Sequence, residues 1–73
     1  MKKLTESDFY NIVKIAVGPS IIGGKTKSQR MFDYLYSVNP EVADSFLGGK
    51  FDGWTFPDYL IPDFLLEICK LVD

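Results

Sequence analysis

The first apolar pattern of the chain follows helical spacing, with Phe, Ile, Val and Ala at positions 9, 12, 13 and 16. Thr5 precedes this pattern as a candidate N-cap, and Asp8 stands three residues later, which is a variant of the capping box. Gly18-Pro19 is a strong stop signal after it. The pattern therefore predicts a helix from Glu6 to Val17.

A second capping pattern opens at Thr26, with Gln29 three residues on. The apolar face that follows consists of Met31, Phe32, Leu35 and Val38. Asn39 then ends this helix and caps a third one, because the proline after it suits the first helical turn. We expect this short third helix over Pro40–Leu47, stopped by the glycines at 48 and 49.

Residues 18–25 connect the first two helices and are predicted to form a loop. Its two central apolar residues, Ile21 and Ile22, are expected to plug into the core. The segment ends in Gly24-Lys25-Thr26, which resembles the end of a phosphate-binding P-loop. Pro19 occupies the position of the required first glycine and removes an amide from such a cradle, so we expect no nucleotide site here.

The C-terminal third combines an aromatic segment with a final helix. Lys50–Phe56 contains the turn-like pair Asp52-Gly53 and is predicted to be an ordered loop. A helical turn, a break at Pro62 and a last helix over Pro62–Val72 follow. Its apolar positions are Ile61, Phe64, Leu65, Ile68 and Val72. The fold class is all-α: four short helices around one core, with an ordered aromatic loop before the last helix.

The composition agrees with one small domain over residues 1–73, because 73 residues leave no room for a second core and 47% of them are apolar. The chain has no histidine and one cysteine, Cys69, which we expect to be buried or half-buried. Without a histidine base or a thiol cluster we predict no enzyme, no metal site and no cofactor. A lone thiol fits the cytoplasm. Neither a membrane span of ~18 apolar residues nor a secretory signal is evident.

Charge divides the chain into a basic and an acidic half. Residues 1–38 carry six basic and three acidic side chains, and residues 39–73 carry two basic and seven acidic ones. Candidate contacts to nucleic acid surround the start of the second helix: Lys25, Lys27, Gln29 and Arg30. The net charge of −2 weighs against that reading, since DNA-binding domains are usually basic.

Aromatic residues form 15% of the chain, more than its helical faces need. We assign four phenylalanines to the core: Phe9, Phe32, Phe46 and Phe64. The candidate partner-binding set is Phe51, Asp52, Trp54, Phe56, Asp58 and Tyr59, because aromatic centres with polar rims are typical of interfaces. Trp54 is either the anchor of that interface or a plug in the core, and Phe51 is likewise either an interface residue or a core residue. Both readings stay open for each of them.

We therefore expect a small, non-enzymatic cytoplasmic protein that binds another protein or a second copy of itself. A bacterial or phage regulator or inhibitor fits its size, with no membrane or small-molecule substrate involved. The alternative is a nucleic-acid-binding regulator that uses the basic patch. A third hypothesis is an acidic decoy whose C-terminal carboxylates occupy a nucleic-acid groove on a target.

Overall fold

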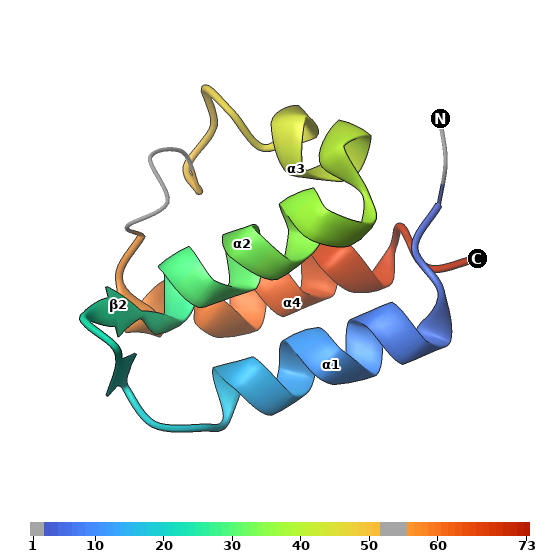
Figure 1. The fold of residues 1–73 in the computed structure, drawn as a ribbon. Coiled ribbons are helices and arrows are strands. Elements are labelled where there is room, and N and C mark those ends of the chain that lie inside the picture. Colours follow the sequence, from blue (N-terminus) through green and yellow to red (C-terminus); the bar gives the residue numbers. More distant parts are fainter. Residues whose placement is uncertain (1–2, 52–55) are drawn as a thin grey trace.

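A computed structural model of the chain describes residues 3–51 and 56–73 (Figure 1). Four α-helices lie within these residues: α1 (Glu6–Ala16), α2 (Lys27–Val38), α3 (Pro40–Ser45) and α4 (Ile61–Cys69). A 3-10 turn, η2 (Asp58–Leu60), leads directly into α4. The strands β1 (Ile21–Ile22) and β2 (Lys25–Thr26) pair between α1 and α2. The mostly helical prediction is confirmed, and the small antiparallel sheet is an addition to it.

The predicted capping residues begin three of the helices. The Thr5 hydroxyl accepts from the Asp8 amide at 3.1 Å, and the Asp8 carboxylate accepts from the Thr5 amide at 3.4 Å. Thr26 and Gln29 repeat this reciprocal box at the start of α2. Asn39 caps α3 by accepting from the Val42 amide at 3.3 Å, and it is buried at the corner between α2 and α3. Each box satisfies amides that a helix start leaves unpaired.

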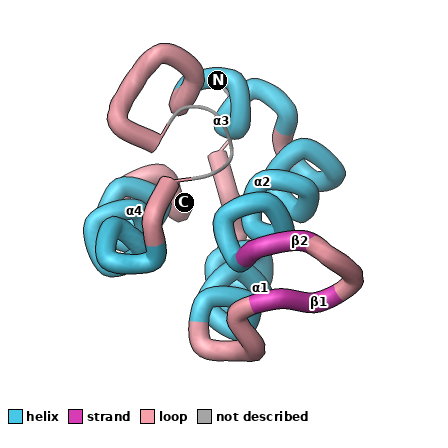
Figure 2. The backbone as a smooth tube through the Cα atoms, turned by 90° about the vertical axis from the view of Figure 1, so that its left-hand side faces the viewer, coloured by secondary structure: helices cyan, strands magenta, loops and turns pink. Residues whose placement is uncertain are grey.

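Three helices surround the core, as the nearly end-on view of α1, α2 and α4 in Figure 2 shows, and α3 closes it from above. Five phenylalanine rings fill the space between α2, α3 and α4, with centroids of neighbouring rings 5.0–6.2 Å apart: Phe32, Phe46, Phe51, Phe56 and Phe64. Phe32 and Phe64 are fully buried, as predicted. Phe9 and Phe46 are partly buried and pack against the core.

The two ends of the described chain pair with each other (Figure 1). The Leu4 amide donates to the Leu71 carbonyl at 3.0 Å, and the Asp73 amide donates to the Leu4 carbonyl at 2.9 Å. These bonds hold the Leu4 side chain fully buried. They also explain why α4 ends at Cys69 and not at Val72 as predicted, since the last residues leave the helix to pair with Leu4.

Among the described helices none has the length and apolarity needed to cross a membrane. The longest, α2, has 12 residues, whereas a span needs about 20.

Candidate functional site

A groove of about 800 Å³ runs between α4 and the turns that follow α3. Its lining residues are Ser45, Phe46, Lys50, Phe51, Asp63, Leu66, Glu67, Lys70 and Leu71. The aromatic part of this lining is the outer edge of the phenylalanine cluster, whereas α4 and the turn after it supply both leucines and three of the four charges. We call this region the α4 groove.

Two ion pairs lie in the α4 groove. The Lys50 ammonium lies 3.4 Å from the Asp63 carboxylate and 5.3 Å from the centroid of the Phe51 ring. The Lys70 ammonium lies 2.9 Å from the Glu67 carboxylate. All four charged side chains are substantially exposed, so each ion pair stabilises the fold by less than ~1 kcal/mol. The charges are therefore free to exchange their partners at little cost.

Two large apolar side chains stand exposed on the η2–α4 segment. Leu66, within the groove, is 63% exposed, and Tyr59 in η2 is 79% exposed. Asp63 and Leu66 of α4 and the C-cap residue Lys70 follow each other at spacings of three and four residues, so they lie on one side of the helix. An apolar side chain flanked by charges beside an aromatic groove is the usual composition of a protein-binding surface.

The structure exposes some residues of the predicted partner-binding set and buries others. Asp58 and Tyr59 are exposed, as a binding surface requires. Phe51 and Phe56 are only 5% exposed, because their rings complete the cluster around Phe64. These two therefore belong to the core, and Phe51 offers the groove only the edge of its ring. Asp52 and Trp54 lie outside the described residues, as do the predicted turn at Asp52-Gly53 and both readings of the tryptophan.

The segment between α1 and α2 folds as a β-hairpin and not as a loop. Ile21 pairs with Thr26 and Ile22 with Lys25, and the connecting Gly23-Gly24 has positive φ at both positions, as a type I′ turn requires. The signal was present in the sequence, because a Gly-Gly pair directly after β-branched residues, here Ile21 and Ile22, is typical of this turn.

The predicted core plug is wrong. Ile21 is 64% and Ile22 53% exposed, and Val17 beside them is 76% exposed. Since α1 and α2 pack directly on each other, the hairpin projects from the end of this pair, where there is no core to enter (Figure 1). We call this projecting hairpin, together with the neighbouring cations Lys14, Lys25 and Arg30, the hairpin end.

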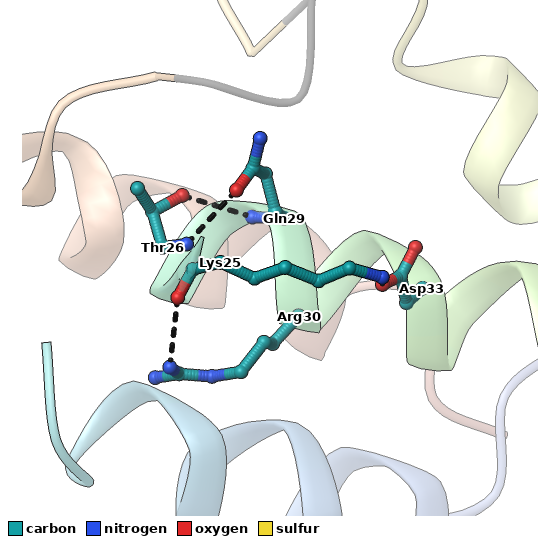
Figure 3. A network of polar contacts seen from close by, with 5 residues as sticks. All are labelled: Lys25, Thr26, Gln29, Arg30 and Asp33. Atoms are coloured by element: carbon teal, nitrogen blue, oxygen red, sulfur yellow. Dashed lines mark hydrogen bonds and ion pairs between the residues drawn. The ribbon is translucent and has the colours of Figure 1, made fainter. Parts of the chain in front are cut away.

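Three of the four predicted nucleic-acid contacts have tasks inside the fold (Figure 3). The Arg30 guanidinium donates to the Lys25 carbonyl at 3.1 Å and also to the Pro19 carbonyl. The Lys25 ammonium contacts the Asp33 carboxylate at 2.5 Å. Gln29 is occupied in the capping box. Lys27 is half-buried in the first turn of α2.

The same contacts show that the segment resembling a P-loop in sequence does not have the structure of one. Gly24 turns the hairpin, Thr26 caps α2, and the Lys25 ammonium is held by Asp33. The segment is built as a strand pair and a helix start, and not as a loop wrapped around a phosphate. A smaller cavity of about 400 Å³ lies behind the hairpin, lined by Asn11, Lys14, Ile15, Gly18, Pro19, Ile22 and Arg30.

Two tyrosine hydroxyls join the helices, a role that the sequence analysis missed. The Tyr34 hydroxyl accepts from the Asn11 amide nitrogen at 3.0 Å and donates to the Asp8 carboxylate at 2.9 Å, which ties α2 to α1. The bond from Asn11 lowers the pKa of Tyr34, but burial and the Asp8 carboxylate outweigh it, so this pKa is raised. Tyr36 donates to Asp44 of α3, and this hydrogen bond raises the Tyr36 pKa.

Cys69 is exposed, against the prediction of a buried or half-buried thiol, because it lies on the outer side of the last turn of α4. In the described part of the chain there is no group of three or more acidic or cysteine side chains placed to hold a metal ion.

Comparison of the chain with protein-family models, with curated proteins and with solved structures found no match in any of the three.

Proposed function

We propose that the protein is a small non-enzymatic protein-binding module and that the α4 groove is its contact surface. The observation that carries this proposal is the exposed Leu66 beside a groove edged by Phe46 and Phe51. Burying an exposed leucine against aromatic edges removes apolar area from water at roughly 25 cal/mol per Å². That gain is the main driving force of protein association.

The acidic character of the predicted surface supports the same proposal. Asp58 and Tyr59 lie at the start of the segment that continues into the groove, with Asp63 one turn further on. A regulator or inhibitor that covers a surface of its target needs only such a contact face. We include a cytoplasmic location in the proposal, supported by the lone Cys69.

The nucleic-acid alternative gains no support from the hairpin end. At this end Asp33 neutralises Lys25, and Arg30 already donates to two backbone carbonyls, so the positive charge left for phosphate contacts is small. We therefore advance no second function.

The test is a capture experiment with a matched pair of variants. Leu66→Asp places a charge in the groove, and Ile21→Asp places the same charge at the hairpin end, where the side chain is 64% exposed. Both substitutions should leave the circular dichroism spectrum unchanged, because both side chains are largely in water.

A partner captured from cells that express the chain should be retained by the wild type and by Ile21→Asp, and lost with Leu66→Asp. Equal capture by both variants, or loss with Ile21→Asp alone, would show that the groove is not the contact surface.

A further inference from the structure

The exposed charges of α4 and of its C-cap residue Lys70 complement each other when the direction of the helix is reversed. Asp63 precedes Leu66 by three residues and Lys70 follows it by four, and all three side chains are exposed. The midpoint between positions 63 and 70 is also the midpoint between positions 66 and 67. If two such helices run antiparallel about that point, position 63 of each copy lies opposite position 70 of the other.

We propose that the α4 groove binds a second copy of the chain, through an antiparallel α4–α4 contact about a twofold axis next to Leu66. This inference rests on the proposed protein-binding function and names the partner. A twofold axis uses the same patch on both copies, so every contact occurs twice. One alignment thus creates two Asp63–Lys70 ion pairs at once.

The apolar part of the groove suits the same symmetry. Leu66 is the projecting side chain, and the groove beside it is edged by Phe46, Phe51 and Leu71. Since both features lie on one patch, the Leu66 side chain of each copy is positioned to enter the groove of the other.

The existing ion pairs do not oppose this contact strongly. Asp63 is paired with Lys50 at 3.4 Å and Lys70 with Glu67 at 2.9 Å, and both pairs are exposed. Lys70 has three donors and is therefore able to keep Glu67 while it meets Asp63 of the second copy. That retention also neutralises the two Glu67 side chains, which come close to each other beside the axis.

The hairpin end lacks this self-complementarity. Its exposed apolar residues Ile21 and Ile22 are accompanied by Lys14, Lys25 and Arg30, and because Asp33 balances Lys25, Lys14 and Arg30 leave a positive surplus. Two copies that met at this end would bring like charges together, which suppresses association.

The size of the face sets the expected affinity. Stable interfaces bury ~800 Å² on each partner, which is just under one fifth of the 4339 Å² surface of the described chain. The nine residues of α4 extend only about 14 Å. We therefore expect a dimer that dissociates in the micromolar range or above, with constants from ~10 μM upward.

Sedimentation equilibrium over a series of protein concentrations tests the inference with charge-reversed variants. Asp63→Lys and Lys70→Asp each place like charges opposite one another, and each alone should weaken self-association at least ~10-fold. An equimolar mixture of the two variants pairs opposite charges again, so it should form a heterodimer. The double variant should recover self-association. Ile21→Asp should associate like the wild type.

A wild type that stays monomeric up to millimolar concentration would overturn the inference, as would a dimer that neither single variant weakens. These outcomes can be distinguished from a failure of the proposed protein-binding function. If the wild type is monomeric but a captured protein still depends on Leu66, the groove binds a different partner and only the second-copy inference fails. A dimer that is insensitive to Leu66→Asp counts against both proposals.

Discussion

The hairpin end and the α4 groove are built in opposite ways. At the hairpin end, polar groups hold the backbone, as Arg30 does with two carbonyls, while Ile21 and Ile22 face water. Beside α4, aromatic rings hold the structure from within while charged side chains face outward. Apolar residues are thus buried where helices pack against one another, as beside α4. They stay exposed where hydrogen bonds fix the backbone, as in the hairpin.

The largest expected effect comes from the aromatic side of this comparison. Phe64→Ala removes the ring that contacts Phe32, Phe46, Phe51 and Phe56, and Phe64 is fully buried. We expect a loss of ~3–5 kcal/mol in the free energy of unfolding, measured by urea denaturation. A loss below ~1 kcal/mol would mean that the rings do not carry the stability of this region.

The polar side of the comparison is tested at Arg30. Arg30→Ala removes the donor to the Lys25 and Pro19 carbonyls, and we expect a loss of about 1–2 kcal/mol, since exposure weakens such bonds. Hydrogen exchange should increase at residues 19–26 and stay unchanged in α4.

Lys27→Ala is the matched control, because it removes a cation from the same helical turn, and its effect should stay within ~0.5 kcal/mol. Equal effects of the two substitutions would attribute the loss at Arg30 to charge alone.

An alkaline titration tests the tyrosine contacts that join α2 to its neighbours. Tyr34 and Tyr36 have raised pKa values, so the folded chain holds their protons more tightly than the unfolded chain does. Their stabilisation is fully present below the ordinary tyrosine pKa of about 10 and is lost as the pH rises through the folded values. Thermal midpoints measured from pH 8 to 12 should therefore fall above about pH 10.

Tyr34→Phe and Tyr36→Phe identify the groups responsible. The double variant should show a smaller decline over the same pH range, because neither phenylalanine ionises. An undiminished decline would assign the effect to other groups.

The smallest effect is expected at the exposed strand. Ile21→Ser changes an apolar side chain that is 64% exposed, so the free energy of unfolding should move by no more than ~0.5 kcal/mol. A loss of 2 kcal/mol or more would restore the reading of Ile21 as a core residue.

The elements that sequence analysis located correctly depend on local contacts. Thr5, Thr26 and Asn39 cap their helices through bonds to residues only three positions away, and such spacing is visible in a sequence. Gly48, which has a positive φ, lies in the turn after α3 as predicted, although the helix itself already ends at Ser45.

The error at Ile21 and the reading left open at Phe51 concern residues whose surroundings are set by distant segments. Phe51 is buried because Phe46, directly after α3, and Phe64, in α4, pack against it. Ile21 is exposed because α1 and α2 close on each other without it. Neither outcome follows from the neighbouring residues. Of the α4 groove, the sequence predicted Phe51 as a candidate contact, but Leu66 was not singled out because it directly follows the apolar positions Phe64 and Leu65.

The pairing of Leu4 with Leu71 and Asp73 brings the two ends of the described chain side by side. Because this bridge is parallel, the two segments leave it in opposite directions, so a glycine linker long enough to run back along the bridge would join them and preserve the path of the backbone. New ends opened at Gly23-Gly24, where a Cβ would meet nothing within 4 Å, would then interrupt only a turn in open solvent. The order of the helices along the chain would then change while their arrangement in space stays the same. The circularly permuted protein would present the α4 groove unchanged.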